Sequence, residues 1–457
     1  MTASVPLALR LAEFAAGTPS DALPALALER AKMSLASTVA SAAMGFNIAS
    51  ARIVRQIEVG NGGAPHATVW FDGTKLPLAG AARVNALTSD AAASDDSDLR
   101  SIAHIGTIIS TVCIALGEKT EASGADMLAA MVLGYEVAGR LDESLTPGRT
   151  QRGFHGSVAT VFGAAVVASR LLRLDAQGMA QAIALAATSI GGMAIAADTS
   201  WAREYHAGQS ASVGMQAALA AAAGFTGELS VLDHPRGFLN AMGGQALDDI
   251  TKDLGQSWDI ATDMAIKLMP GAHPFHATAE AAAEAARLGQ IRSADVDSIV
   301  ISAAVQRSNF KDNRHPRNLV DAAHSLVYFV AAAIADDGFG WQHVDPAKMA
   351  DPVIASLQDK ISFDPDPPPL PDRFPHRHGG TVTIRTKDGR TFSSTCTAPR
   401  GSGPRGVHWA DVAGKFRDLV KLAGLPPDRI EASLDLIRNF DVSSRAPELT
   451  ALLTVGA

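Results

Sequence analysis

The chain has 457 residues, of which 47% are hydrophobic and 19% charged, with a net charge of −8. This length is ample for a large core and suggests two or three domains. The mildly acidic balance argues against nucleic acid as the main partner. The two cysteines, Cys113 and Cys396, fit a reducing cytoplasm and offer no spacing for a zinc site.

Most of the chain before Pro270 is expected to be helical. Apolar residues recur at helical spacing over residues 23–44. Ser123 and Asp126 suit the first turn of a helix that runs through Leu141, because hydroxyl acceptors and negative charge satisfy free amides there. Further Ala-rich helices are predicted over residues 158–174, 176–190 and 207–223.

One uncharged segment, residues 176–197, is long enough to resemble a membrane span. It is dominated by alanine and contains the Gly191-Gly192 pair, which fits a buried helix better than a bilayer. We therefore expect no membrane association. The first apolar stretch contains Arg10 and Glu13, which argues against a signal peptide.

The pattern changes after Pro270. Alternating β-branched residues predict a strand at 296–302, and residues 381–394 predict a hairpin on an Asp-Gly turn. Helices are predicted at 321–336, 409–422 and 428–439. The expected fold is mainly α, with a large all-helical domain over 1–268, a small α+β domain over 269–404, and C-terminal helices over 405–457.

The turn that begins at Lys267 is the most informative candidate site. It reads Lys267-Leu-Met-Pro-Gly-Ala-His273-Pro-Phe-His276. The lysine could bind a carboxylate or donate a proton, and the histidines could move a proton near neutral pH. The combination predicts a small anionic substrate and proton-transfer chemistry.

Two further clusters precede predicted helices. Residues 94–98 carry three aspartates ahead of His104, which either cap a helix as solvated charges or orient a catalytic histidine. Their carboxylates also suit Mg²⁺, but the ligand set is too sparse to predict a metal. Arg152-Gly-Phe-His155-Gly156 has glycines that allow close approach of a ligand, although a lone histidine can equally be structural.

Arg203 and Tyr328 are candidates with open alternatives. Arg203 could fork onto a substrate carboxylate or form a surface pair with Glu204. Tyr328 could carry an active hydroxyl or be a core phenol. We find no phosphate-binding loop, hydrolase elbow or dinucleotide fingerprint.

Taken in order, these clusters resemble the MmgE/PrpD family, which includes 2-methylcitrate dehydratase, cis-aconitate decarboxylase and iminodisuccinate epimerase. The resemblance covers almost the whole chain and is carried by Asp95-Asp96-Ser97 with His104, Gly134-Tyr135-Glu136, Gly153-Phe-His155-Gly, Ala207-Gly208, Gly224-Phe-Thr-Gly, Lys267-Leu-Met-Pro270 and His324-Ser-x-x-Tyr328. It implies a large helical domain to which the C-terminal helices return, a smaller α+β lid, and a homodimer. It also implies an active site between the domains, small di- or tricarboxylate substrates and no cofactor.

The resemblance and the clusters together give the candidate site residues. The catalytic candidates are Lys267, His155, His104 and Tyr328, and the substrate-binding candidates are Arg203, Asp96, Ser97, His273 and Arg152. Arg203 stands where similar lyases have lysine, and a fixed fork suits a carboxylate clamp better than a proton shuttle. Asp90 and Ala93 stand where the family often reads His-x-x-Asp.

These departures favour an isomerase: an epimerase that moves a proton next to a carboxylate of an iminodisuccinate-like substrate. A lyase, either a 2-methylcitrate-type dehydratase or a cis-aconitate-type decarboxylase, is the alternative. A non-catalytic helical scaffold is a third hypothesis. We expect a cytoplasmic homodimer that binds a small carboxylate and needs neither metal nor cofactor.

Overall fold

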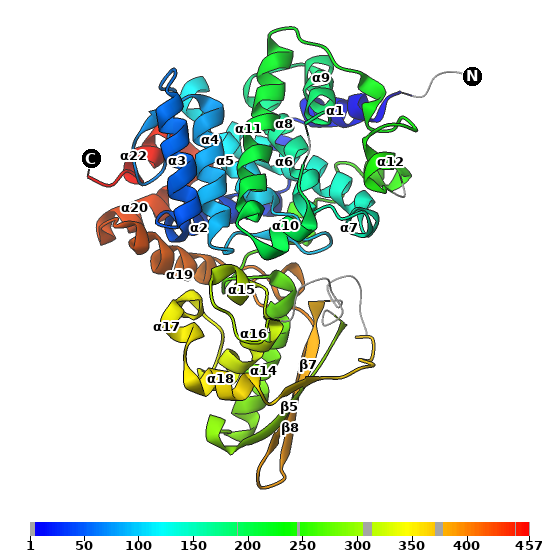
Figure 1. The fold of residues 1–457 in the computed structure, drawn as a ribbon. Coiled ribbons are helices and arrows are strands. Elements are labelled where there is room, and N and C mark those ends of the chain that lie inside the picture. The colour runs from blue at the N-terminus through cyan, green and yellow to red at the C-terminus, as the bar shows by residue number, and fades with distance from the viewer. Residues whose placement is uncertain are drawn as a thin grey trace. The chain divides into compact units, whose positions relative to one another are not determined.

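The computed structural model describes residues 5–189, 191–244, 247–304, 313–370, 378–443 and 445–456. The chain divides into two compact units (Figure 1). The large unit contains Met1–Ala197, Trp201–Ile266 and Trp409–Ala457, and the small unit contains Asp198–Ser200 and Lys267–His408. The divisions lie next to the predicted boundaries at 268 and 404. The chain is mainly helical with a smaller α+β part, which confirms the predicted fold class.

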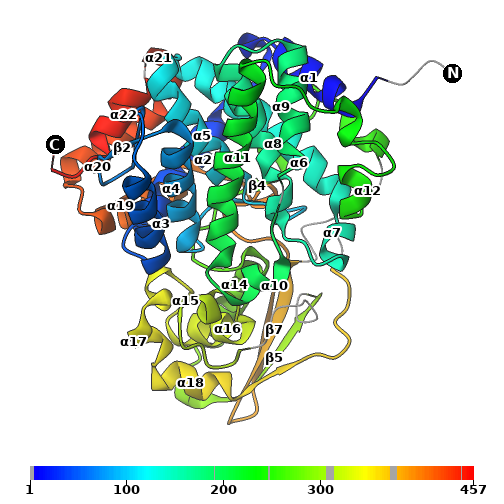
Figure 2. The same cartoon turned by 45° about the horizontal axis from the view of Figure 1, so that its top comes forward.

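The large unit is built from helices that pack closely through small residues. Its helices are α1 (Leu7–Gly17), α2 (Ala25–Gly45), α3 (Ala49–Asn61), α4 (Leu78–Ala91), α5 (Ile105–Thr120), α6 (Gly124–Leu145), α7 (Gly148–Gln151), α8 (Thr160–Leu171), α9 (Ala176–Ala186), the first part of α10 (Ala194–Thr199), α11 (Ala202–Ala222), α12 (Phe238–Met242), α13 (Asp259–Thr262), α19 (Trp409–Val420), α20 (Pro427–Arg438), α21 (Phe440–Ser443) and α22 (Ala446–Leu452). Helix α11 packs against α4 and α8, and α6 packs against α8 (Figure 2). A Cβ on Gly134 would lie 2.9 Å from the Gly163 carbonyl oxygen, so glycine permits the α6/α8 contact.

Several predicted helices are confirmed, with shifted ends. Ser123 caps α6 by accepting a hydrogen bond from the Asp126 amide at 3.2 Å. Helix α11 begins at Ala202 rather than at 207, because the residues from Arg203 to His206 contain no helix breaker. The predicted end of α9 at residue 190 lies outside the described residues, and α9 ends at Ala186. Among the described helices none is long and apolar enough to cross a membrane.

The C-terminal helices belong to the large unit. Helix α19 packs on α2 and buries Val412, Phe416 and Leu419. Lys415 of the same helix is also buried and donates to Ser37 Oγ at 2.8 Å and to the Ser94 carbonyl. Helix α19 therefore contacts the segment that carries the predicted aspartate cluster, through the hydrogen bond from Lys415 to Ser94.

The small unit contains a four-stranded sheet with helices on one face. Its elements are α14 (His276–Gly289), β5 (Val296–Ala303), α15 (Leu319–Ala323), α16 (Leu326–Ala335), α17 (Pro346–Met349), α18 (Pro352–Gln358), β6 (Ile361–Phe363), β7 (Gly380–Thr386) and β8 (Thr391–Cys396). The strand order is β6-β5-β7-β8, with β5 and β6 parallel and the other pairs antiparallel. The predicted strand and hairpin are confirmed. The predicted helix over 321–336 is wrong in one detail, because Ser325 caps α16 and so separates it from α15.

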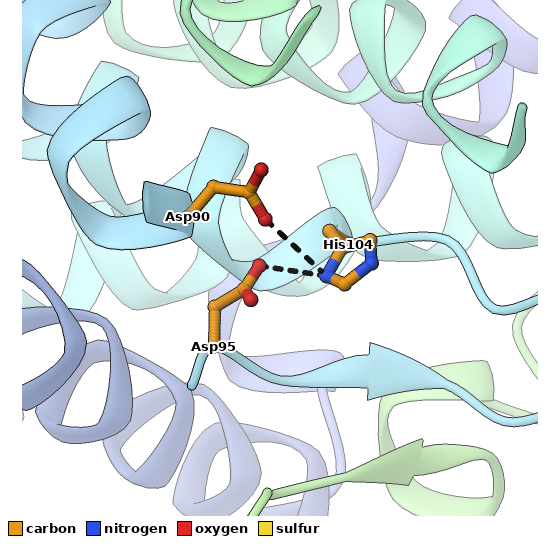
Figure 3. A group of neighbouring side chains, drawn as sticks. All are labelled: Asp90, Asp95 and His104. Carbon is orange, nitrogen blue, oxygen red and sulfur yellow. Dashed lines mark hydrogen bonds and ion pairs between the residues drawn. The ribbon is translucent and has the colours of Figure 1, made fainter. Parts of the chain in front are cut away.

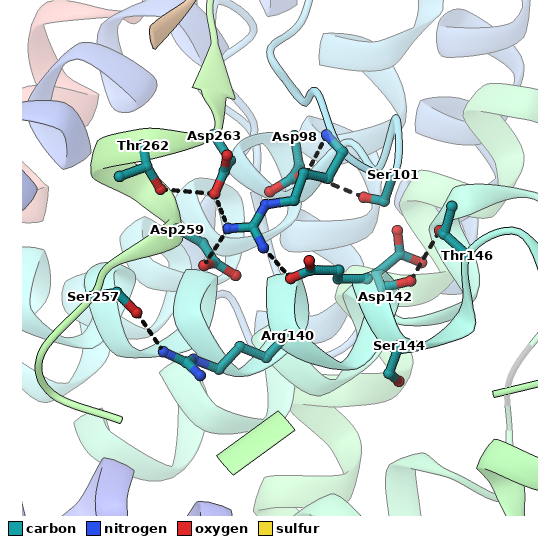
Figure 4. Close-up of polar contacts among 12 residues, drawn as sticks. Asp98, Ser101, Arg140, Asp142, Ser144, Thr146, Ser257, Asp259, Thr262 and Asp263 are labelled. Carbon is teal, nitrogen blue, oxygen red and sulfur yellow. Dashed lines mark hydrogen bonds and ion pairs between the residues drawn. The ribbon is translucent and has the colours of Figure 1, made fainter. Parts of the chain in front are cut away.

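A short two-stranded ribbon ties the aspartate segment to the end of the large unit. Strand β3 (Ser97–Asp98) pairs antiparallel with β4 (Met264–Ala265). Arg100 binds Asp259 at 3.3 Å and also contacts Asp263 and Glu143. Figure 4 labels Asp98, Asp259 and Asp263 of this group. Burial and the nearby Asp263 carboxylate raise the pKa of Asp98 to about 8. The ribbon therefore lies next to a network in which Arg100 binds several carboxylates.

Candidate active site

His104 is oriented by a buried carboxylate at the start of α5. Its Nδ1 lies 2.7 Å from Asp95 Oδ2 and 3.8 Å from Asp90 Oδ1 (Figure 3). Thr107 Oγ1 donates to the same Asp95 oxygen at 3.2 Å. Since Nδ1 is engaged, Nε2 is the nitrogen that can exchange a proton with another molecule. The arrangement resembles the base and orienting carboxylate of acid–base enzymes.

A second histidine stacks beside His104. The ring centroids of His104 and His155 are 6.0 Å apart, with an interplanar angle of 15°. The His155 amide donates to the Gly192 carbonyl at 2.9 Å, which fixes the turn. Burial, followed by the positive charge of neighbouring groups such as His104 and Arg149, lowers the pKa of His155 well below its usual value. His155 is therefore neutral at pH 7.

The two histidine turns are brought together by a glycine. A Cβ on Gly156 would lie 2.8 Å from the Ile102 carbonyl oxygen and 3.2 Å from the Ala103 Cα. Ile102 has φ of 62° and Ala93 has φ of 52°, so non-glycine residues adopt a left-handed conformation at both ends of the aspartate segment. Strain of this type concentrates at functional sites.

The aspartate segment is buried, which excludes the alternative of solvated charge. Residues 94–98 are each at most 2% exposed. Asp96 accepts a hydrogen bond from Ser34 at 2.6 Å, and a Cβ on Gly106 would lie 1.9 Å from Asp96 Oδ2. Burial raises the pKa of Asp96 to about 6. Asp96 is therefore packed between α2 and α5, and Ser97 follows it in strand β3.

Arg203 is also buried and is engaged with the protein itself. Its Nε lies 3.1 Å from Asp90 Oδ2, and it donates to the Asp90 carbonyl oxygen at 2.6 Å. The pair of Arg203 with Glu204 is present at 3.7 Å, but it is buried and not on the surface, since Glu204 is 2% exposed and also accepts from Ser50 at 2.8 Å. Two of the three departures from the family pattern, Arg203 and Asp90, therefore contact each other, and the guanidinium of Arg203 neutralises the Asp90 carboxylate.

Of the remaining predicted residues, Lys267, His273 and Tyr328 belong to the small unit and Arg152 belongs to the large unit. Lys267 and His273 are buried in the small unit, and the His273 ring is 4.6 Å from that of His276. Tyr328 lies in the core of the small unit, where its hydroxyl donates to the His343 carbonyl at 2.8 Å and burial raises its pKa. Arg152 is exposed and donates to the Asn240 and Ala241 carbonyls.

The structure thus brings six groups together within the large unit: His104, His155, Asp95, Asp96, Ser97 and Arg203. Sequence reasoning did not single out His206, whose ring centroid is 6.2 Å from that of His155. His206 follows Arg203 by one helical turn, which was a usable signal once α11 was extended to Ala202. Sequence reasoning also considered Asp90 only as a departure from the family pattern, and not as a member of the site.

The same carboxylates could in principle bind a metal ion. Single donor atoms of Asp90, Asp95 and His104 lie within 4.8 Å of one another. However, Asp90 is neutralised by Arg203, and Asp95 already binds Nδ1 of His104. A metal ion would have to displace both contacts, so these residues fit an acid–base pair better than a cation site.

Comparison with known proteins identifies the family. The MmgE/PrpD N-terminal domain matches residues 9–250, and the MmgE/PrpD C-terminal domain matches residues 269–439. The chain belongs to the MmgE/PrpD family. This confirms the resemblance seen in the sequence motifs.

Three named relatives match most of the chain. Human cis-aconitate decarboxylase is 25% identical over 437 residues, which span 93% of this chain and 90% of that protein. The mouse cis-aconitate decarboxylase is 27% identical over 405 residues, with 84% and 80% covered. The cis-aconitate decarboxylase-like protein oryM of Aspergillus oryzae is 23% identical over 468 residues, with 95% and 94% covered.

Proposed function

We propose that this MmgE/PrpD protein is a cofactor-independent lyase that decarboxylates a small unsaturated polycarboxylate of the cis-aconitate type. The single observation that carries the proposal is the 2.7 Å contact between Asp95 Oδ2 and His104 Nδ1. That contact orients an imidazole for proton transfer in a buried site. The activity named for the relatives supports decarboxylation as the reaction.

The predicted epimerase has lost part of its support. It relied on Arg203 as a clamp for a substrate carboxylate. In the structure Arg203 is bound to Asp90, and the pair is buried. The proposed lyase does not need a free guanidinium at this position. In it the Arg203/Asp90 pair has a structural role, which is to hold α4 against α11.

The proposed chemistry requires one proton for each CO₂ released. The bond from carbon to one carboxylate breaks, and its electron pair passes into the conjugated system, where a remaining carboxylate holds it as an enolate-like anion. Cationic groups stabilise an anion of this kind. A general acid then protonates carbon.

We assign the proton donor to Nε2 of His104. When Nε2 is protonated, the Asp95 carboxylate compensates the charge of the imidazolium. General acid–base catalysis of this kind contributes roughly 10²–10⁴-fold to a rate. His155 is neutral at pH 7 and can hydrogen-bond to a substrate carboxyl group or pass on a proton.

The experiment is a substrate panel in deuterated water. Purified protein is incubated with cis-aconitate, 2-methylcitrate and iminodisuccinate, while CO₂ is measured and proton NMR follows the products. We expect CO₂ and a deuterated unsaturated dicarboxylate from cis-aconitate. Loss of water from 2-methylcitrate would make the protein a dehydratase. Exchange at the α-carbon of iminodisuccinate without CO₂ or alkene would reinstate the epimerase.

A further inference from the structure

We propose that His206 is the outer member of a three-histidine proton relay, His206 to His155 to His104, which refills the catalytic acid from solvent. The inference rests on the proposed function, because decarboxylation consumes one proton in each turnover. His206 acts through His155 and is not assigned any contact with substrate.

The geometry places three rings in a row. The centroids of His104 and His155 are 6.0 Å apart, and those of His155 and His206 are 6.2 Å apart. The rings come from three separate elements: the start of α5, the turn before α8, and the second turn of α11. Intervals of this size are too long for direct hydrogen bonds between the rings, but single water molecules can bridge them.

The row runs from a buried end to an accessible end. His104 is 7% exposed, whereas His155 and His206 are both partly exposed. The neighbours of His206 are open to solvent, since Trp201 is 52% and Tyr205 is 45% exposed. His206 can therefore take up a proton from bulk water.

The electrostatics give the relay a direction. Burial lowers the pKa of both His206 and His155, so each ring is neutral at pH 7 and does not retain a second proton. His104 is the ring that contacts a carboxylate, Asp95, and this is where positive charge is compensated. The nearby carboxylate of Asp90 also attracts a proton toward His206, but it is already paired with Arg203.

His206 also has a nitrogen available for the relay. Its Nδ1 is buried and has no hydrogen-bond partner among the residues that the structure describes. A Cβ on Gly192 would come within 3.3 Å of this atom, and the carbonyl of the same glycine accepts the His155 amide. In each transfer a ring accepts a proton at one nitrogen and releases one from the other, so the relay gains no net charge.

The test compares His206→Gln with the unaltered protein as buffer concentration changes. In dilute buffer we expect kcat for CO₂ release to fall about tenfold or more in the variant while kcat/KM is unchanged, because only the refilling of the acid after CO₂ release is impaired. Added imidazole should restore kcat in a saturable way, and kcat of the unaltered protein should not respond. His234→Gln removes an exposed histidine of the large unit and serves as the matched control.

Two outcomes would overturn the relay. One is a kcat of His206→Gln equal to that of the unaltered protein at every buffer concentration. The other is a loss that imidazole does not restore, which would indicate a merely structural role. If the unaltered protein releases CO₂ but either outcome is found, only the relay is wrong, whereas absence of CO₂ from the unaltered protein would contradict the proposed function itself.

A second measurement avoids the variant and any failure of it to fold. In mixtures of H₂O and D₂O, a relay moves several protons together, so kcat of the unaltered protein should fall as a curve with increasing deuterium fraction. A straight line, which indicates a single transferred proton, would contradict the relay.

Discussion

At the scale of single residues, the chemistry depends on how Asp95 holds the imidazole of His104. One carboxylate oxygen lies 2.7 Å from Nδ1 and also accepts from Thr107 at 3.2 Å. The carboxylate both fixes the tautomer and compensates an imidazolium. An amide at this position can do neither in the same way, because it can donate to Nδ1 and so reverse the tautomer.

We therefore predict that Asp95→Asn lowers kcat by roughly 10²–10⁴-fold with little change in the fold. Thr107→Val is the matched control, because it removes one hydrogen bond to Asp95 and keeps the carboxylate. It should cost much less activity. Steady-state kinetics with circular dichroism on both variants is the measurement. Equal losses in the two variants would mean that the carboxylate has no role in the chemistry.

Some residues of the site could be predicted from the sequence, and others could not. The motifs alone identified His104, His155, Asp96 and Ser97 as members of one region. The pairing of Arg203 with Asp90 could not be found this way, because 113 residues separate the two partners. A run of aspartates also resembles solvated charge in sequence, and only the packing of α2 and α5 around it shows that it is buried.

At the scale of elements, Gly156 sets the distance between the turns that carry His104 and His155. We predict that Gly156→Ala displaces these turns, lowers kcat, and costs about 1–3 kcal/mol of stability, because the new Cβ would meet Ile102 and Ala103. Gly191→Ala is the control, since a Cβ there has nothing within 4 Å. Urea unfolding would measure the stability of both variants, and steady-state kinetics would measure their kcat. Full activity in Gly156→Ala would contradict the proposed spacing.

The β3/β4 ribbon makes stability depend on pH. Asp98 has a pKa raised to about 8 in the folded chain. Its contribution to the free energy of unfolding is therefore complete below the pKa that Asp98 has in the unfolded chain, and it is lost as pH rises through about 8. Asp98→Asn carries no charge to bury. We predict that this variant gains stability over the parent at pH 8 relative to pH 5, measured by urea unfolding. An unchanged difference between the two pH values would show that Asp98 is not protonated in the folded chain.

Local patterns predicted the elements better than their ends. Helical periodicity and the Ser123 cap identified α2 and α6, and the Asp-Gly turn identified the β7/β8 hairpin. The start of α11 was placed too late, because the polar residues from Arg203 to His206 obscure the helical pattern. Arg203 and Glu204 are buried by contacts with other elements, which local sequence does not reveal.

At the scale of the whole molecule, the large unit is completed by the end of the chain. The C-terminal helix α19 buries Val412, Phe416 and Leu419 at 1% exposure or less. Each such side chain contributes about 1.5–3 kcal/mol when fully buried. Lys415 adds buried hydrogen bonds to Ser37 and to the carbonyl oxygen of Ser94.

We predict that a chain ending at residue 404 does not form a stable large unit. Thermal unfolding and limited proteolysis would show a lower melting temperature and rapid cleavage of the region around α2. Co-expression of residues 405–457 as a separate polypeptide should restore protection and is the control. A truncated chain that melts like the parent would show that α19 is dispensable.

The decisive measurement follows CO₂ and deuterium together in a single turnover of cis-aconitate in D₂O, for the unaltered protein and for His104→Gln. We predict one deuterium on carbon for each CO₂ released by the unaltered protein, and a rate lower by roughly 10²–10⁴-fold in the variant. An unchanged rate of CO₂ release in His104→Gln would contradict the assignment of His104 as the acid. Deuterium exchange into the substrate without any CO₂ would contradict decarboxylation.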